Sequence, residues 1–297
     1  MSYEQDFHWS KAIKKGIESA LLTEADLTFF YMDTKVNKAG GAQKASEAFA
    51  LYSSLNPDGV ITIDDNAQSM FVVPYLKDKV STPVMFAGVN AAPAKYGFPN
   101  DHISGVLERG HIRESIVFLQ QLMPKVSKIG FITKDSPSGK AVIGQVEEEK
   151  GDYAASICGI EFVHDVATVK AAAQSLSESC DAVYIDGAAG IKKPQGGSLS
   201  YSELFSLVAQ DFSGPIIGAN GHHVESGAFS AVVKTGYEQG NRAGSLLLKA
   251  MQGTPVSAIP VTRNYRGKRV LNATAVKKFS LTPRPVLLRG VKLVRGQ

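Results

Sequence analysis

The side chains best suited to bind a small molecule follow short apolar runs, and this pattern occurs once in each half of the chain. In the first half these residues are Asp64, Asp65, Asn66 and Asn90, and in the second they are Asp186, Gly187 and Asn220. Buried strands of a parallel sheet read as continuous apolar runs, and ligands bind beyond the carboxyl ends of such strands. The repeat therefore predicts two sheets, each with a polar rim, that together form a ligand-binding cleft.

The group Asp64, Asp65 and Asn66 follows the apolar run 60–63. One carboxylate at this position could cap the following helix by accepting hydrogen bonds from free backbone N–H groups. Two carboxylates exceed what a cap needs, so we expect one of them to bind a ligand ammonium or hydroxyl group.

The loop Ser136-Pro-Ser-Gly-Lys140 lies between an expected strand and an expected helix. Ser136, Ser138 and Gly139 could present hydroxyl and backbone N–H groups to an anion such as a carboxylate. The loop lacks the GxxxxGK[ST] pattern of a nucleotide-binding loop. An ordinary serine N-cap explains the same residues equally well.

Asp186 and Gly187 end the matching strand of the second half, where the carboxylate could meet a ligand amine or only hold its own loop. Asn90 and Asn220 lie at equivalent places, and an amide offers both a donor and an acceptor. Asparagine is also a common turn residue, so neither is diagnostic alone.

His222, His223 and Glu225 resemble a metal-binding group at first sight. Adjacent side chains point apart and no further ligand cluster accompanies them, so we expect no metal site and a role for His222 in the cleft. Among the aromatic residues near the start, we expect Tyr3 to contact ligand and Trp9 to pack under the first helix.

Composition fits a globular protein of two domains: the chain has 297 residues, of which 44% are hydrophobic and 20% charged. The net charge of +4 is concentrated toward the end of the chain, but no DNA-binding motif accompanies it, so we expect a solvated surface and no nucleic-acid partner. Cys158 and Cys180 have no metal-like spacing, and we expect two buried free thiols. No apolar run is long enough for a membrane span, and the residues after Met1 do not form the apolar core of a signal peptide.

Apolar periodicity predicts helices alternating with strands, which is typical of α/β proteins with parallel sheets. The expected helices cover residues 6–22, 44–55, 66–79, 113–122, 140–149, 169–176, 201–210 and 237–251. The expected strands cover residues 27–32, 60–63, 84–87, 128–133, 160–163, 183–185, 216–218 and 228–234, and short strands and loops follow residue 260.

We expect two Rossmann-like lobes joined by a multi-strand hinge. The first lobe comprises residues 1–105 and 236–260, and the second comprises 106–235 with part of 261–297. The crossings are expected near 105–108, 232–236 and 260–264, and repeated crossings permit a hinge motion.

Several motifs taken together resemble a known family. They are Tyr31-Met-Asp-Thr-Lys35, Asp64-Asp-Asn66, Phe86-Ala-Gly-Val-Asn90, Gly105-Val-Leu-Glu108, Ser136-Pro-Ser-Gly-Lys140 and Gly236-Tyr-Glu-Gln-Gly240. In order and spacing the chain resembles the periplasmic binding protein type 1 fold, specifically the ABC-transporter substrate-binding family that includes tryptophan-binding-type proteins. It departs from the family at the start, which resembles the loop after a first strand.

The resemblance implies a periplasmic or otherwise extracytoplasmic protein that delivers a small solute to an ABC permease, without a cofactor and without catalysis. An anion-accepting loop, carboxylates and aromatic residues together suit a zwitterion, so an amino acid, aromatic or branched, is the expected ligand. A sugar or nucleoside would also suit the Asp and Asn residues, and a receptor's ligand-sensing domain would share the fold. Sequence motifs of common enzyme classes, such as GxSxG, HExxH and GxGxxG, are absent.

Overall fold

A computed structural model describes residues 1–296, and its chain folds into two units. The first unit comprises Met1–Arg109 and Thr235–Asn264, and the second comprises Gly110–Lys234 and the residues from Tyr265 onward. The chain therefore passes between the units three times. Strand β3 (Ile103–Leu107) pairs with neighbours of the first unit.

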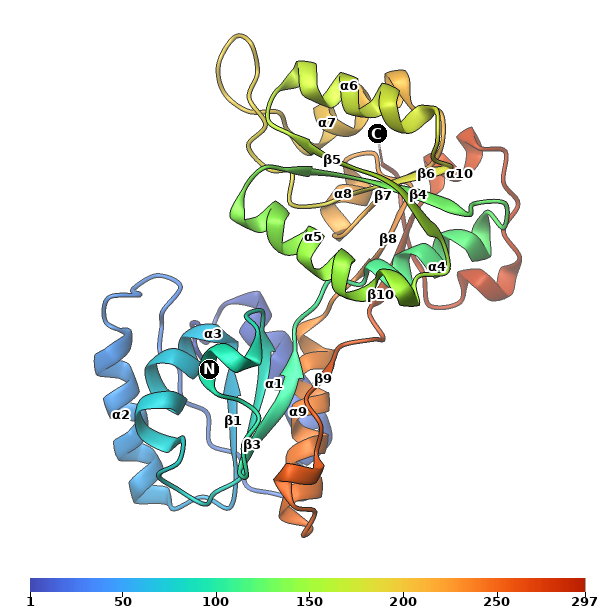
Figure 1. Ribbon diagram of the computed structural model, residues 1–297. Coiled ribbons are helices and arrows are strands. Elements are labelled where there is room, and N and C mark those ends of the chain that lie inside the picture. Colours follow the sequence, from blue (N-terminus) through green and yellow to red (C-terminus); the bar gives the residue numbers. More distant parts are fainter. Residues whose placement is uncertain (297) are drawn as a thin grey trace. The chain divides into compact units, whose positions relative to one another are not determined.

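The first unit is built around a four-stranded parallel sheet in the order β1-β2-β3-β9 (Figure 1). Its strands are β1 (Val60–Ile63), β2 (Val84–Val89), β3 and β9 (Thr262–Arg263). Its helices are α1 (His8–Leu21), α2 (Gly41–Leu55), α3 (Asp64–Ala67), η1 (Gln68–Leu76), η2 (Pro93–Tyr96), α9 (Gly236–Met251) and η4 (Val256–Ala258).

Helices α1 and α9 lie against each other on one face of this sheet because glycines let their backbones approach closely. A Cβ atom on Gly16 would lie 2.1 Å from the carbonyl oxygen of Tyr237, and one on Gly240 would lie 2.1 Å from that of Ile13. No larger residue fits at either position. The apolar face of α1 is thereby held over the sheet, and its first turn is held near the carboxyl ends of the strands.

The second unit contains a four-stranded parallel sheet in the order β5-β4-β6-β7 and a three-stranded sheet in the order β11-β10-β8. The strands are β4 (Lys128–Lys134), β5 (Ser156–Val163), β6 (Ala182–Ile185), β7 (Ile216–Gly218), β8 (Ser230–Val233), β10 (Lys268–Asn272) and β11 (Lys292–Val294). The helices are α4 (Ile112–Leu122), α5 (Pro137–Glu149), η3 (Lys150–Asp152), α6 (Val166–Ser177), α7 (Tyr201–Asp211), α8 (Gly221–Glu225), α10 (Ala273–Lys278) and η5 (Pro285–Leu288).

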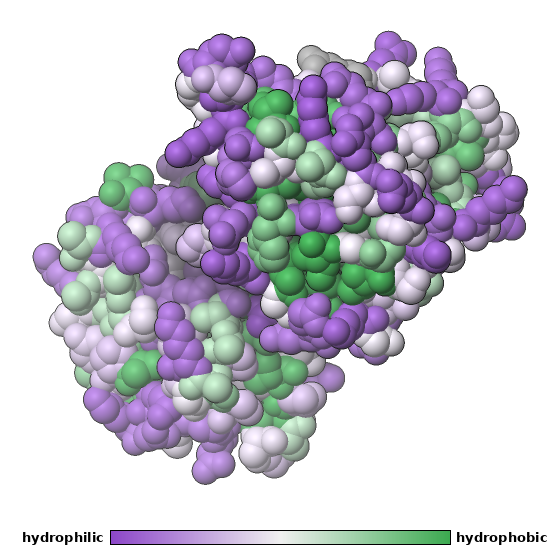
Figure 2. Space-filling view, turned by 45° about the horizontal axis from the view of Figure 1, so that its top comes forward, coloured by the Kyte–Doolittle hydropathy of each residue, from purple (hydrophilic) through white to green (hydrophobic). Residues whose placement is uncertain are grey.

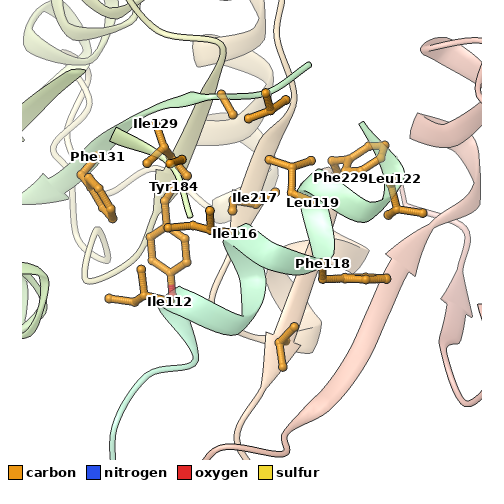
Figure 3. Close-up of a cluster of buried hydrophobic side chains, with 14 of the residues drawn as sticks. Ile112, Ile116, Phe118, Leu119, Leu122, Ile129, Phe131, Tyr184, Ile217 and Phe229 are labelled. Carbon is orange, nitrogen blue, oxygen red and sulfur yellow. The ribbon is translucent and has the colours of Figure 1, made fainter. Parts of the chain in front are cut away.

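The core of the second unit forms where α4 packs against its sheets (Figure 3). Ile112, Ile116 and Leu119 recur at helical spacing and are almost fully buried. Together with Phe131 of β4 and Tyr184 of β6, they belong to one cluster of buried side chains. The sheet is thus anchored from one side, and its strands end in the loops that carry the polar residues.

The α/β alternation expected from the sequence is confirmed, but three local expectations are wrong. Residues 27–32 form no assigned strand, although the run is apolar. The helix expected over 66–79 is a short α-helix followed by the π-helix η1, which contains Pro74. The tail, expected to hold short strands and loops, also contains the helix α10.

The expectation of two free thiols is also wrong. Cys158 of β5 and Cys180, which follows α6, form a disulfide across a sequence separation of 22. The bond ties the edge strand of the second sheet to the helix that covers it. Sequence spacing alone could not distinguish this pair from two reduced cysteines.

The surface carries mostly polar side chains on the face shown in Figure 2, with apolar side chains gathered in smaller patches. Within residues 1–296, no helix is long and apolar enough to cross a membrane.

Candidate functional site

The first rim comprises the polar residues at the carboxyl ends of β1, β2 and β3, together with Tyr3. These residues are Tyr3, Asp64, Asp65, Asn90 and Glu108. Three carboxylates thus occur on one edge of one sheet. Their electrostatic influence converges on Tyr3, whose pKa is raised to about 12 by burial and then by the charges of Asp64, Glu108 and Asp65.

Asp64 is the most unusual residue of the first rim. It is only 4% exposed, and its φ of 67° places it in the left-handed region, where few residues other than glycine occur. The indole Nε1 of Trp9 donates a hydrogen bond to Asp64 Oδ1 at 3.2 Å. Burial, and then the negative charge of Glu108, raise the pKa of Asp64 to about 8. At neutral pH this carboxyl is therefore mainly protonated, and a nearby cation would favour its ionised form.

Asp65 has a different environment, because its carboxylate oxygens are used within the unit. Oδ2 accepts from the backbone N–H of Asn90 at 3.0 Å, and Oδ1 accepts from Ala91 N at 3.2 Å and from the Tyr96 hydroxyl at 2.8 Å. Asp65 thus shapes the loop after β2. Asn66 is also held internally, since its amide donates to Thr34 Oγ1 at 3.0 Å.

Asn90 is exposed at the end of β2, and its Nδ2 donates to Gly88 O at 3.3 Å. Behind it lies a buried amide network: Gln239 accepts from Gly88 N at 2.9 Å and donates to Leu107 O and Asn264 Oδ1, each at 3.2 Å. The network joins the ends of β2 and β3 to the last residue of the unit. It therefore fixes the backbone from which the first rim projects.

Tyr3 is half-buried and packs edge-on against Phe7, with ring centroids 5.6 Å apart. The ammonium group of Lys35 lies 4.9 Å from the Tyr3 ring centroid, a cation–π contact. Tyr3 thus gives the first rim an aromatic wall. Trp9 packs against the cluster that contains Ile13 and Ile17, and in addition its indole holds the carboxyl of Asp64.

The second rim comprises residues at the carboxyl ends of β4, β6, β7 and β8 in the second unit. These residues are Thr133, Ser136, Ser138, Gly139, Asp186, Gly187, Asn220, His222 and Lys234. Asp186 is the carboxylate of this set, and Asp135, which directly follows β4, is a second carboxylate at the same end of the sheet.

Two glycines bring the loops of the second rim into close contact. A Cβ atom on Gly187, whose φ is 63°, would lie 2.9 Å from Thr133 Oγ1 and 3.1 Å from Gly139 N. A Cβ atom on Gly139 would lie 2.0 Å from Lys134 O. The loops after β4 and β6 therefore meet through backbone atoms. The hydroxyl of Thr133 is buried beside them without a hydrogen-bond partner in the structure.

Ser136 forms the N-cap of α5, with its Oγ accepting from Gly139 N at 3.2 Å. The N-cap role that the sequence left open is therefore present, and it occupies one N–H that an anion could have used. Ser138 is exposed in the first turn of the same helix. Lys140 pairs with Asp135 at 2.9 Å.

Asp186 is largely buried at the end of β6. Burial raises its pKa, while the N–H of Gly187 and the nearby side chains of Lys234 and His222 act in the opposite direction. Lys234 was not among the residues singled out from the sequence, although it follows an apolar run in the same way as Asp186.

His222 is exposed, whereas His223 is fully buried and its Nδ1 accepts from Ala219 N at 3.1 Å. Burial lowers the pKa of His223 to about 3, so this imidazole is neutral. Asn220 is the N-cap residue of α8, but its side chain makes no capping bond. No group of three metal-ligating side chains occurs among residues 1–296.

In the sequence analysis, Glu108 belongs to an expected crossing and to a motif of the family resemblance, but not to the expected ligand-binding residues. The structure places it at the end of β3 beside Asp64, where it acts on the pKa values of Asp64 and Tyr3. The signal that could have identified it is the one used for Asp64: a carboxylate directly after a buried apolar run.

Comparison with known proteins shows one consistent family. A family model described as ABC transporter substrate binding protein matches residues 12–292. A tyrosine-binding protein of Clostridioides difficile (strain R20291) is 27% identical over 213 residues, which cover 70% of this chain and 57% of that relative. The match thus spans less than two thirds of the relative's length.

Solved structures agree on the fold. A ligand-free, open substrate-binding protein with adhesive properties from Clostridium difficile aligns with 100% of this chain and 97% of its own, at a TM-score of 0.71 and 16% identity. An ABC domain in complex with L-Trp from Streptococcus pneumonia aligns with 99% of this chain and 97% of its own, at a TM-score of 0.54 and 17% identity. These neighbours confirm the periplasmic binding protein type 1 fold. The chain therefore belongs to the ABC transporter substrate-binding protein family.

Proposed function

We propose that the protein captures a free amino acid, with the first rim binding its ammonium group and the second rim its carboxylate, and delivers it to an ABC permease. The observation that carries this proposal is the acidic first rim. Asp64 is almost fully buried there, and the charge of Glu108 acts on it. A buried carboxyl beside a second carboxylate is costly to ionise, and a ligand ammonium offsets that cost. A neutral sugar offers no such charge.

The second rim supports the other half of the proposal. Ser138, with its exposed hydroxyl, belongs to one of the two loops that meet at Gly139 and Gly187, and Lys234, which follows β8, acts electrostatically on Asp186. Hydroxyl, backbone and cationic groups of this kind suit a carboxylate. The chain passes three times between the units, so we propose that the units close on the ligand as a hinge.

An aromatic amino acid is the preferred ligand. Tyr3 and Phe7 supply an aromatic wall beside the first rim, and a bound aromatic side chain would stack or pack edge-on against it. The tyrosine-binding relative and the L-Trp complex favour the same class.

We also propose an extracytoplasmic location. The Cys158–Cys180 disulfide supports it, because such bonds persist in oxidising compartments and are rare in the cytosol.

A thermal-shift screen of ligand-stripped protein tests the proposed function. A ligand at about a thousand times its dissociation constant adds about 4 kcal/mol of stability. That stabilisation raises Tm by several degrees for domains of this size. We expect aromatic amino acids to produce the shift. A shift with a sugar or nucleoside and with no amino acid would overturn the proposal.

A further inference from the structure

Residues 265–297, here called the basic tail, differ in charge from the rest of the chain. Nine of the 32 Lys and Arg residues lie in this segment, whereas all 28 Asp and Glu residues lie in residues 1–264 and give that part a net charge of −5. The positive net charge of the protein therefore comes entirely from the basic tail. Such an asymmetry within one chain is typical of proteins that bind a polyanion or an anionic membrane.

The basic tail belongs to the second unit, where it includes β10, α10, η5 and β11 (Figure 1). Its apolar residues Leu287, Leu288 and Val291 pack against the buried cluster that contains Ile116 and Leu119. Its cations remain outside this core. The exposed ones are Arg266, Lys268, Lys277, Lys278, Arg284, Arg289, Lys292 and Arg295.

Several of these cations have no acidic partner. Lys292 pairs with Glu225 at 3.1 Å. Within residues 1–296, no acidic side chain forms an ion pair with Lys278, Arg284 or Arg289. Cations held on one surface without counter-charges attract an anionic partner.

Two of the exposed apolar side chains lie among these cations. Val286 is 68% exposed and Leu293 is 55% exposed. The N–H of Arg289 donates to Val286 O at 3.4 Å, and residues three apart in such a 3₁₀ turn lie on the same side of it. Leu293 directly follows Lys292 in β11. Apolar side chains next to cations fit the boundary between lipid headgroups and acyl chains.

We propose that the basic tail is an interaction surface for a membrane of anionic lipids. Arg284 and Arg289 would bind phosphate headgroups, and Val286 and Leu293 would enter the boundary with the acyl chains. Nucleic acid has the same phosphate chemistry, but it offers no apolar layer for these two side chains. A membrane-bound second unit would keep the protein at the surface where a permease lies.

The test is flotation of the ligand-free protein with lipid vesicles. One set contains phosphatidylcholine alone, and the other contains phosphatidylcholine mixed with anionic phosphatidylglycerol. Thermal unfolding confirms that each variant is folded, and binding to duplex DNA is measured in parallel. The variants are Arg284→Glu with Arg289→Glu, Val286→Ser with Leu293→Thr, and, as a control with the same change in charge, Lys15→Glu with Lys38→Glu, two exposed lysines of the first unit.

We expect binding to the mixed vesicles and not to phosphatidylcholine alone, with affinity that falls as salt is raised. The Arg284/Arg289 variant should bind the mixed vesicles about tenfold more weakly or less, because each cation near an anionic surface contributes to binding. The Lys15/Lys38 control should keep its affinity. The Val286/Leu293 variant should lose about threefold or more in affinity for vesicles, because apolar area is no longer buried, and should bind DNA as before.

Three results would overturn the proposal: no binding to the mixed vesicles, equal binding to phosphatidylcholine alone, or an equal loss in the Lys15/Lys38 control. Full vesicle affinity in the Val286/Leu293 variant would also contradict it, because the basic tail would then attract any polyanion through charge alone. All measurements are made without ligand, so their outcome is independent of the proposed function.

Discussion

The two rims arise from the same sequence pattern, yet their electrostatic environments differ. Asp64 follows β1 and Asp186 follows β6, and burial raises the pKa of both. The charge of Glu108 raises the pKa of Asp64 further, against the Trp9 hydrogen bond and the Met1 amino group, whereas Lys234 lowers the pKa of Asp186. An internal repeat therefore sets the position of a carboxylate, while residues distant in sequence set its charge. The first rim suits a cation, and the second suits a ligand of mixed or negative charge.

The units also differ in covalent cross-linking by a disulfide, and this difference should have the largest effect on stability. Only the second unit contains the disulfide, which closes a loop of 22 residues in sequence separation. Reduction should lower the free energy of unfolding of this unit by about 3 kcal/mol. Denaturant unfolding with and without a reducing agent, followed by hydrogen exchange, measures the effect for each unit. Equal losses in both units would contradict the comparison.

The second-largest expected effect is on ligand affinity, and it distinguishes the carboxyl of Asp64 from that of Asp186. Asp64→Asn should weaken amino-acid binding by about tenfold to a hundredfold, because a charge-assisted bond to the ammonium is lost. Asparagine tolerates the left-handed backbone of Asp64, and the carboxyl is mainly protonated without ligand, so Tm should change little.

Asp186→Asn is the matched variant in the second rim, and we expect it to weaken binding less. Isothermal titration calorimetry with the amino acid that gives the largest thermal shift measures both variants. An equal loss for the two variants would show that the rims do not divide the ligand as proposed.

A third effect concerns the backbone of the second rim. Gly187→Ala should cost about 1–2 kcal/mol of stability and weaken binding, because the residue has a positive φ and its Cβ would crowd Thr133 and Gly139. Gly196→Ala is the matched control, since Gly196 also has a positive φ but no atom would lie within 4 Å of its Cβ. The control should lose stability without losing affinity. If both variants lose affinity, the close contact of Gly187 with Thr133 and Gly139 is not what ligand binding requires.

The smallest expected effect is the release of a proton from Asp64 when ligand binds. The pKa of Asp64 is raised to about 8 from an ordinary 3.8, so folding binds a proton between these pH values. Its contribution to stability is full below the unfolded pKa and is lost as pH rises toward 8. A ligand ammonium would favour the ionised form, and binding at pH 7 should release close to one proton. Calorimetry in two buffers of different ionisation enthalpy detects this release, and Asp64→Asn should abolish it. Proton uptake by the unaltered protein would contradict the assignment.

Much of the fold could be predicted from the sequence because buried parallel strands read as continuous apolar runs. The runs before Asp64 and Asp186 are both strands with polar residues at their ends. The same reasoning fails for residues 27–32, which are apolar but lie beside a groove and not beside a complete neighbouring strand. Apolar character shows that a segment is buried, but not that its backbone is paired.

The site could be predicted less completely, because the role of a side chain depends on neighbours that periodicity does not reveal. Asp64 and Asp65 are adjacent, yet one is buried against Trp9 and the other shapes a loop through Asn90 and Tyr96. Only the three-dimensional contacts distinguish them. Pairing of the two cysteines could not be predicted for the same reason.

The most direct test of the central claim compares L-tyrosine with two analogues that each lack one charged end. Tyramine lacks the carboxylate, and 3-(4-hydroxyphenyl)propionate lacks the ammonium group. Isothermal titration calorimetry of ligand-stripped protein should show binding of L-tyrosine and at least a hundredfold weaker binding of both analogues. If 3-(4-hydroxyphenyl)propionate binds as tightly as L-tyrosine, the acidic first rim does not recognise an ammonium group and the central claim is contradicted.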